Sequence, residues 1–382
     1  MSGDSDPPKK PDLPPDDLDL TRTAGTRMPR PHEQPDHELN RTFERLVGSE
    51  EVSWSLRYRM IRPLGHGGQG VVYLTDRIGS YDTHFRLALK FFRPSAYPTM
   101  TEYQHDMARM SRVSARLSRI QQDNLVDVYN VMDMDGIEVQ TMEWVDGIDL
   151  RQLTEHAVHD RVQKRITAER WDYLNDVVAT RGPDQLRFKP GIAISIAREC
   201  LRGLAALHRN GIVHADVKPA NLMVKRTGAV KLIDMGAAFT AEEPARRQAW
   251  TPRYAAMEVV AGEPHTAASD LASLGYVLVE MLTGRLPFES AKTTSALAEQ
   301  KARMPRELDR VLPPDCDHTL REFIRRLIEP DPAARYESAE EADLGDGGAA
   351  DFQNLLVKGD LSSEYTNELR LWLREVIGEE AD

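Results

Sequence analysis

The sequence predicts an α+β fold of two lobes, a small antiparallel β-sheet lobe with one helix followed by a larger, mainly helical lobe. Strand-like runs crowd between residues 57 and 144, one stretch of helical period lies among them, and helical patterns dominate after Leu150. This order of elements favours two lobes with a cleft between them. The length of 382 residues fits one large domain or two ordinary ones.

The small lobe is predicted from runs rich in apolar and β-branched residues that are separated by glycine or polar turns. Five strands are expected, at residues 57–64, 71–76, 85–92, 125–132 and 137–144. A helix is expected over Thr101–Ile120, because apolar residues recur there at steps of three and four. These residues are Met107, Met110, Val113, Leu117 and Ile120.

Both ends of the chain and one internal segment differ in composition from the rest. Eight of the 23 prolines lie in the first 35 residues, so residues 1–50 are predicted to be a disordered Pro- and Asp-rich arm, with room for a short helix at 39–47. Residues 155–189 read as a polar helical insertion. Residues 346–382 are expected to form a tail with an amphipathic helix near 365–377.

The composition excludes several classes of protein. Lys and Arg number 49 and Asp and Glu 61, and the net charge of −12 argues against a nucleic acid partner, although a local positive site remains compatible with it. Hydrophobic residues make up 41% of the chain, enough for a real core. The two cysteines, Cys200 and Cys316, make neither a disulfide scaffold nor a four-ligand zinc site, so a reducing compartment is expected.

The sequence also argues against a membrane partner. No stretch approaches 18 uninterrupted apolar residues, and the most apolar one, 191–207, contains Arg198, Glu199 and Arg202. Its spacing is that of a buried amphipathic helix. The N-terminus shows no apolar region typical of a secretory signal. We therefore expect a soluble, cytoplasmic protein, and the sequence does not indicate an oligomeric state.

A glycine-rich turn and a lysine in the small lobe indicate phosphate binding. The turn fits G-x-G-x-x-G-x-V, a pattern that lets backbone N–H groups approach phosphate oxygens, although alone it is as typical of a plain hairpin. A strand follows it, which disfavours the dinucleotide-binding version of the motif. Lys90 lies one strand later among apolar residues, where it is either an edge lysine reaching solvent or a contact to α- and β-phosphates. The four glycines are Gly65, Gly67, Gly68 and Gly70.

The segment His214–Leu222, HADVKPANL, and the following Ile233–Gly236, IDMG, together indicate a metal–phosphate site. Asp216 could orient an attacking hydroxyl, and Lys218 could neutralise charge on a moving phosphoryl group. Asn221 and Asp234 could supply the hard oxygen ligands that Mg²⁺ prefers. Any one of these residues could be an ordinary loop polar group, but the whole set at this spacing is hard to explain otherwise.

Over residues 57–345 the chain resembles the eukaryotic-type, bacterial Ser/Thr protein kinase family. The family's H-R-D-x-K-P-x-N loop corresponds to HADVKPAN, its D-F-G to Asp234–Gly236, and its A-P-E to Ala256–Glu258, which follows Thr251–Tyr254. Residues 269–275 resemble the family's buried helix. Residues 331–335 resemble the site whose Arg, here Arg335, pairs with the Glu of A-P-E, here Glu258. The resemblance implies a two-lobed protein-kinase fold, with the N-lobe at about 57–143 and the C-lobe at about 146–345.

The resemblance also implies an activity, partners and site roles. The expected reaction is transfer of the ATP γ-phosphoryl group, with Mg²⁺, to Ser or Thr hydroxyls of protein substrates, with the chain itself as one candidate substrate. Asp216, Lys218 and Lys90 would be catalytic, and Asn221 and Asp234 would bind the metal. The nucleotide would contact the four glycines, Lys90, Val72, Ala88, Asp149 and the hinge residues Glu143 and Val145, behind the gatekeeper Met142.

Two departures from the family pattern bear on the activity. The helix after Lys90 should carry a Glu that pairs with it, but the expected position is Val113, and the nearest acids are Asp106 and Glu102. This motivates an alternative function, a pseudokinase that acts as a nucleotide-binding scaffold; a small-molecule kinase is a third hypothesis. Ala215 replaces the usual Arg, which predicts activation without loop phosphorylation. A basic stripe on the same helix is expected to be solvated or to dock an acidic partner: Arg109, Arg112, Arg116 and Arg119.

Overall fold

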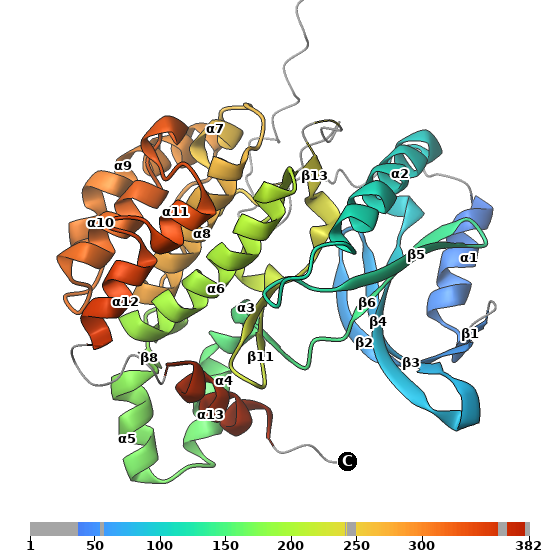
Figure 1. Cartoon of the computed structure of the whole chain (residues 1–382), viewed down its shortest axis with the longest axis horizontal. Coiled ribbons are helices and arrows are strands. Elements are labelled where there is room, and N and C mark those ends of the chain that lie inside the picture. Colours follow the sequence, from blue (N-terminus) through green and yellow to red (C-terminus); the bar gives the residue numbers. More distant parts are fainter. Residues whose placement is uncertain (1–36, 54–56, 241, 243–249, 358–364, 379–382) are drawn as a thin grey trace, which may run out of the picture.

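A computed structural model describes residues 37–53, 57–240, 242, 250–357 and 365–378. Figure 1 shows a sheet lobe, drawn in blue and cyan, beside a larger lobe of helices, drawn from green to red. The predicted two-lobed α+β fold is therefore confirmed. Among the described residues, no helix combines the length and the apolar character that a membrane crossing requires.

The small lobe is built on one six-stranded sheet with the order β1-β2-β3-β4-β6-β5, in which all neighbours are antiparallel. Each strand that the sequence predicts is present, with ends shifted by a few residues. The strands are β1 (Glu51–Ser53), β2 (Arg57–Gly67), β3 (Gly70–Ile78), β4 (His84–Phe92), β5 (Val128–Met134) and β6 (Ile137–Glu143).

Helix α1 (His37–Val47) packs on this sheet and corrects part of the predicted N-terminal arm. Its Phe43 is 1% exposed in a cluster with Leu89 and Ile137 of the sheet, and the Arg93 guanidinium lies 5.2 Å from the Phe43 ring centroid. The short helix that the sequence allows at 39–47 is therefore present, and it begins just after the last proline of the arm, Pro35. The rest of the predicted arm, residues 1–36, lies outside the described residues.

Helix α2 (Met100–Leu117) is the longest helix among the described residues of the small lobe. The Thr99 side chain caps its first turn by accepting a hydrogen bond from the Glu102 N–H, at 3.2 Å. The predicted apolar residues Met107, Met110, Val113 and Leu117 are all buried. The helix ends at Leu117, so Ile120 lies beyond it in the connection to β5.

The core of the large lobe surrounds two buried helices, α6 (Pro190–Arg209) and α8 (Ala267–Thr283), which contact each other. Nearly every side chain of α8 is buried, which matches its almost uniformly apolar sequence. The surrounding helices are α3 (Leu150–Leu153), α7 (Met257–Val260), α9 (Thr294–Val311), α10 (His318–Leu327), α11 (Ala339–Leu344) and α12 (Ala349–Val357).

Short strands in the large lobe carry the loops that the next subsection describes. One antiparallel sheet has the order β12-β11-β7, and a separate pair joins β10 to β13. The strands are β7 (Gly147–Asp149), β10 (Ile212–Val213), β11 (Leu222–Lys225), β12 (Val230–Leu232) and β13 (Phe239–Thr240). Short 3-10 turns follow Lys218 and Asp234.

The segment 155–189 is not the purely helical, polar insertion that the sequence predicts. Helices α4 (His156–Gln163) and α5 (Ala168–Val177) are followed by an antiparallel pair, β8 (Ala179–Arg181) and β9 (Leu186–Phe188). Leu174, Leu186 and Phe188 are fully buried in the core of the large lobe. The alternation of Leu186 and Phe188 is too short to distinguish a strand from a helix by period.

The tail helix α13 (Tyr365–Ile377) has the predicted bounds and covers this segment, as Figure 1 shows in dark red beside α4. Trp372 is fully buried and its ring stands edge-on to Phe188, with the centroids 5.6 Å apart. Arg170 pairs with Glu368 at 3.1 Å and with Glu375 at 2.7 Å. The tail and the segment 155–189 therefore form one packed unit on the large lobe.

Candidate active site

The glycine-rich turn joins β2 to β3, with Gly67 opposite Gly70 in the ladder and Gly68 in the turn. A Cβ added to Gly65 or Gly67 would meet no atom within 4 Å, so the backbone there faces open space. A Cβ on Gly70 would lie 1.9 Å from the Phe91 carbonyl oxygen, so this position requires glycine for packing. The turn thus exposes backbone at two of its glycines.

An apolar cluster joins the two lobes beside this turn. Its buried members are Ala88, Val126, Met142 and Val145, and Leu64, Val72, Met223 and Ile233 pack against them. Ala88 pairs with Met142 across β4 and β6. The cluster is of a kind that binds a flat apolar ring between two lobes. The predicted nucleotide residues Val72, Ala88 and Val145 are brought together here.

Two residues of this cluster, Met223 and Ile233, were missed by the sequence analysis. Both come from the large lobe, and each lies next to a predicted metal ligand: Met223 two residues after Asn221, and Ile233 just before Asp234. The available signal was their apolar character in short strand-like runs on either side of the polar motifs.

The hinge residue Glu143 and the nearby Asp149 both use their carboxylates within the protein. Glu143 accepts a 2.6 Å hydrogen bond from Nζ of the buried Lys231. Asp149 caps α3 by accepting a 2.9 Å hydrogen bond from the Gln152 N–H. Burial raises the pKa of Asp149, against the opposing effects of that hydrogen bond and of Arg151. The cap uses Oδ1 of Asp149, and Oδ2 takes no part in it.

Lys90 forms an ion pair with Asp234, from opposite lobes. The Lys90 side chain is 7% exposed and its ammonium also lies 5.1 Å from the Phe92 ring centroid. Burial alone would raise the pKa of Asp234, but attraction by Lys90 and Lys218 and the Gly236 N–H hydrogen bond lower it to about 2. Asp234 is therefore ionised at neutral pH. Its backbone is left-handed, with φ 60°.

The α2 position where an acid is expected is Val113, which has no carboxylate to offer Lys90. Its side chain is buried in the core cluster of the large lobe. Asp106, one of the two acids considered as a substitute, is held elsewhere. It accepts hydrogen bonds from the Tyr97 hydroxyl at 2.9 Å and from Arg109 Nε at 2.8 Å. The other acid, Glu102, lies in the first turn of α2.

Asp216 is the centre of a hydrogen-bonded group that joins two segments of the chain, residues 216–221 and the segment around Thr251. Thr251 Oγ1 donates to its Oδ1 at 2.8 Å, and Lys218 Nζ lies 2.7 Å from its Oδ2. Lys218 also donates to Thr251 Oγ1 at 3.2 Å. The Asn221 amide nitrogen donates to the Asp216 carbonyl at 2.8 Å and to Oδ2 at 3.2 Å. Of the predicted catalytic and metal residues, this group brings together Asp216, Lys218 and Asn221.

Asp270, buried at the start of α8, fixes the backbone of this loop. Its carboxylate accepts hydrogen bonds from the N–H groups of His214 at 2.9 Å and Ala215 at 2.8 Å, and lies 2.9 Å from His208 Nε2. Burial raises the pKa of Asp270, but His208, His214 and these hydrogen bonds lower it overall. The two hydrogen bonds from the backbone also hold Ala215 at φ 64°, a left-handed conformation that residues other than glycine rarely adopt.

Asn221 and Asp234 carry the oxygen atoms that a magnesium ion would need. The Asn221 amide nitrogen donates to Asp216, so the Asn221 side-chain oxygen would be the atom left to bind a metal. The described residues contain no group of three or more His, Cys, Asp or Glu that could hold a metal. Mg²⁺ does not require one, because in phosphate sites it takes one or two protein oxygens and completes its octahedron with water and phosphate.

The activation segment is the stretch from Asp234 to Glu258. Arg335 and Glu258 connect its end to the core of the large lobe. The guanidinium donates to both carboxylate oxygens at 2.7 Å, and Ser269 donates to one of them at 2.8 Å. Burial raises the pKa of Glu258, but the attraction and hydrogen bonds of Arg335 lower it overall. This is the pair that the resemblance implied.

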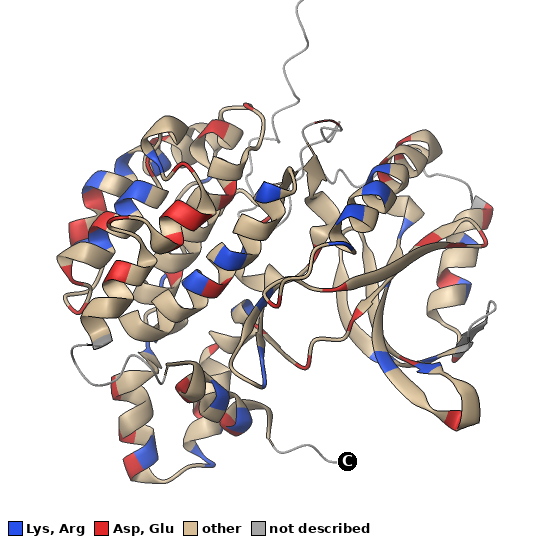
Figure 2. Cartoon of the chain, in the orientation of Figure 1, with Lys and Arg blue, Asp and Glu red and all other residues tan. Residues whose placement is uncertain are grey.

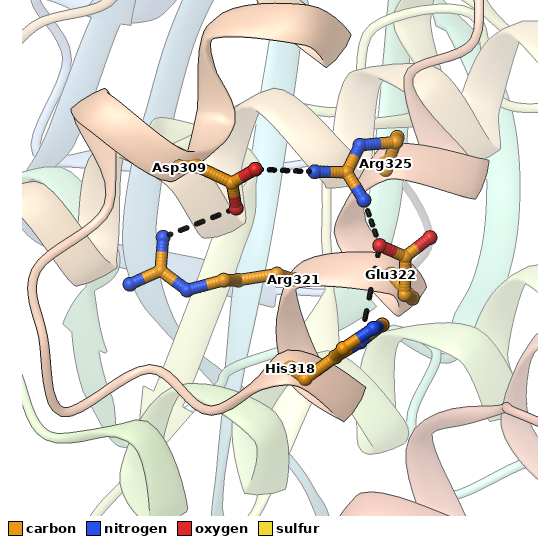
Figure 3. A pocket seen from close by; sticks show the side chains of 5 residues that line it. All are labelled: Asp309, His318, Arg321, Glu322 and Arg325. Carbon is orange, nitrogen blue, oxygen red and sulfur yellow. Dashed lines mark hydrogen bonds and ion pairs between the residues drawn. The ribbon is translucent and has the colours of Figure 1, made fainter.

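A separate surface pocket of about 300 Å³ lies between α9 and α10 (Figure 3). Asp309 forms ion pairs with two arginines, with Arg321 at 3.7 Å and with Arg325 at 3.3 Å. Glu322 also pairs with Arg325. Arg321 also donates to the carbonyls of Leu312 and Pro313, which follow α9. These charges satisfy one another and the end of a helix, so the pocket is structural.

Comparison with known proteins agrees with this geometry. Residues 58–343 match the family described as "Protein kinase domain". The chain is 29% identical to serine/threonine-protein kinase pkn2 of Myxococcus xanthus, over 77% of this chain and 32% of that protein. It is 28% identical to PrkC of Bacillus subtilis, over 78% and 41%, and 28% identical to PknB of Mycobacterium tuberculosis, over 75% and 42%.

The matched region is thus less than half of the length of each of these relatives. It nevertheless includes the glycine turn, Lys90, the Asp216 loop, Asp234 and Glu258. The three relatives named above are serine/threonine-protein kinases of bacteria. The family match extends over most of the chain, and the folded order of its motifs agrees with it. The chain therefore belongs to the protein kinase family.

Proposed function

We propose that this chain is an ATP- and Mg²⁺-dependent protein kinase that phosphorylates Ser and Thr hydroxyls of protein substrates. One observation carries the proposal: Asp216, Lys218 and Thr251 bond to one another, and Lys218 also lowers the pKa of Asp234, which pairs with Lys90. A carboxylate that can accept a proton is thereby grouped with two cations that can hold phosphate. That combination is what phosphoryl transfer requires.

The nucleotide would bind where the apolar cluster meets the glycine turn. Ala88, Val72 and Met223 would enclose the adenine, and the backbone groups of Glu143 and Val145 would hold its edge. The open backbone at Gly65 and Gly67 would face the phosphates. Lys90 would exchange part of its contact with Asp234 for the α- and β-phosphate oxygens, since both are anionic partners.

The chemical step would place a substrate hydroxyl against Asp216. Its Oδ1 and Oδ2 are oriented by Thr251 and Lys218, so the carboxylate can accept the hydroxyl proton as the oxygen forms a bond to the γ-phosphorus. The bond from that phosphorus to the ADP oxygen breaks. Lys218 would stabilise the charge on the transferred group. Magnesium, held by Asn221 and Asp234, would neutralise charge on the phosphate oxygens.

The experiment is phosphate transfer from ATP to a generic protein substrate, and to the chain itself, by the purified chain and by Asp216→Asn. We expect Asp216→Asn to lower the rate by roughly 10²–10⁴-fold, the range for loss of a positioned base. Asp309→Asn, in the pocket of Figure 3, is the matched control and should transfer at the wild-type rate. Undiminished transfer by Asp216→Asn would refute the assignment.

The same measurement separates this proposal from the nucleotide-binding scaffold. The scaffold hypothesis rested on the missing acid at Val113, whereas the groups that would contact phosphate, metal and hydroxyl are all present and mutually oriented. Phosphate incorporated into the wild-type chain and mapped to Ser or Thr by mass spectrometry would exclude the scaffold. Nucleotide binding without any incorporation, with a substrate or without one, would support it.

A further inference from the structure

Helix α2 is connected to the active site by an arginine. Arg109 is 4% exposed, and its NH1 and NH2 groups donate to the carbonyls of Ala238 and Gly236, the latter at 3.0 Å. Gly236 lies inside the 3-10 turn that begins directly after Asp234, and Ala238 follows that turn. Arg109 belongs to the basic stripe that was expected to be solvated or to dock an acidic partner. Figure 2 shows basic residues along α2, but Arg109 is buried.

A chain of hydrogen bonds fixes the orientation of the Arg109 side chain. Asp106, one turn earlier on α2, accepts a hydrogen bond from Arg109 Nε at 2.8 Å and lies 2.7 Å from its NH2 group. The Tyr97 hydroxyl donates to the other oxygen of Asp106 at 2.9 Å. The planar guanidinium therefore has an acid on one edge and two carbonyls on the other. This arrangement neutralises a buried charge and aims it at the turn.

The turn that Arg109 holds also orients Asp234. The Gly236 N–H donates to Asp234 Oδ1 at 3.1 Å, and the Gly236 carbonyl accepts from Arg109. A displacement of α2 would thus move the residue that holds the Asp234 carboxylate. In the family template this mechanical connection runs through a Lys–Glu ion pair. Here the α2 position that would carry the Glu is Val113, and the neighbouring Ser114 accepts a neutral hydrogen bond from Gln140 at 2.9 Å.

A second arginine of α2 contacts the same segment farther along. Arg116 pairs with Glu242, although both side chains are largely exposed, at 44% and 71%. An ion pair this exposed adds little, because water screens it. The buried contact of Arg109 is therefore the one that couples the helix to the segment after Asp234.

We propose that Arg109 is the positioning residue that sets the metal-binding Asp234 for catalysis, in place of an ion pair between α2 and Lys90. This inference rests on the proposed kinase function, and it adds a residue that does not touch substrate. It predicts that the helix acts on Asp234 through backbone carbonyls, and that Lys90 needs no acid from α2.

The test compares Arg109→Met and Arg109→Lys with Arg119→Met, an exposed arginine just after α2, in the full chain. The first readout is hydrogen exchange of the Gly236 and Ala238 amides. We expect exchange at least tenfold faster in Arg109→Met and an intermediate value in Arg109→Lys, because one ammonium cannot reach two carbonyls and an acid together. Arg119→Met should match the wild type. Unchanged exchange in Arg109→Met overturns the inference.

The second readout is turnover against Mg²⁺ concentration. We expect Arg109→Met to lower kcat by roughly 10–100-fold, the effect of a small misplacement of a catalytic group, and to raise the Mg²⁺ concentration for half-maximal rate. A merely structural residue would lower the melting temperature and leave the Mg²⁺ dependence unmoved, which also overturns the inference. Absence of turnover in the wild type refutes the kinase proposal instead, and the exchange readout then decides on Arg109 by itself.

Discussion

Thr251 donates its hydroxyl hydrogen to Asp216 Oδ1 at 2.8 Å, across 35 residues of sequence. The same oxygen of Thr251 accepts a hydrogen bond from Lys218 at 3.2 Å. Thr251 therefore lies between the proposed base and the proposed phosphate-stabilising cation, and it comes from the activation segment. A shift of that segment would therefore change the orientation of the Asp216 carboxylate.

Replacing Thr251 by Val should slow phosphate transfer, whereas Thr251→Ser should retain most of it. Valine keeps the shape but removes the hydroxyl, and a hydrogen bond to a charged group contributes about 1.5–3 kcal/mol. The expected loss in kcat is therefore roughly 10–100-fold. Steady-state kinetics at saturating ATP measure it. A Thr251→Val enzyme as fast as Thr251→Ser would show that the hydroxyl does not orient Asp216.

Breaking the Arg335–Glu258 pair should cost far more stability than breaking an exposed pair. Arg335 is 2% exposed and makes two 2.7 Å hydrogen bonds to Glu258, so Arg335→Met leaves a carboxylate partly buried without its partner. The expected loss is about 3–5 kcal/mol in the free energy of unfolding, measured by urea denaturation. Arg181→Met breaks an exposed pair with Asp160 and should cost less than about 1 kcal/mol. Equal losses would contradict this reasoning.

Enlarging Ala88 should block the proposed adenine site. Ala88 is 4% exposed and faces Met142 and Val145 in the cluster that joins the lobes. Ala88→Leu would fill the space that the ring needs, so we expect at least about a tenfold weaker affinity for ATP, with an unfolding penalty of about 1–3 kcal/mol from overpacking. Isothermal titration measures the affinity, and thermal melting checks that the variant folds. Unchanged affinity in a folded variant would place adenine elsewhere.

Much of the fold and of the candidate site was predictable because the signals are local. The strands and α2 follow from the period of apolar residues, and Asp216, Asn221 and Asp234 lie in short polar loops between buried strands. The turn after Asp234 and the cap at Thr99 are likewise encoded by a few neighbouring residues. Such features survive without knowledge of what packs against them.

The residues that could not be predicted owe their positions to tertiary contacts. Arg109 lies in a helix whose other arginines face solvent, and only the approach of the Gly236 carbonyl distinguishes it. Phe188 lies in the segment predicted to be a polar insertion, and it is buried because Trp372, 184 residues later in the sequence, packs against it. Single-sequence patterns contain no information on such partners.

The tail helix should contribute to the stability of the large lobe through Trp372. This side chain is fully buried against Phe188, in the core cluster that also contains Leu174. Trp372→Ala should lower the free energy of unfolding by about 3–5 kcal/mol, as expected for a large aromatic removed from a core. Denaturant titration measures the loss, and Leu355→Ala, on the exposed side of α12, is the control. A loss below about 1 kcal/mol would show that α13 is not part of the cooperative core.

Two buried histidines should make the protein less stable as the pH falls below about 6.5. Burial lowers the pKa of His265, against the attraction of Asp270, Asp216 and Glu258, and burial lowers the pKa of His159. Below the ordinary histidine pKa of about 6.5 the unfolded chain takes up protons that the folded chain does not, so the free energy of unfolding decreases with falling pH. It decreases by at most about 1.4 kcal/mol per pH unit for each such group.

The pH effect of His265 is measured as a difference between two proteins, since carboxylates with raised pKa values, such as Glu280, act in the opposite direction. Urea denaturation at pH 7.5, 6.5 and 5.5 gives the slope for the wild type and for His265→Gln. Its Nε2 is buried without a hydrogen-bond partner among the described residues, so the uncharged substitute should flatten the slope between pH 6.5 and 5.5. Parallel curves for the two proteins would mean that His265 is protonated as readily in the folded chain as in the unfolded one.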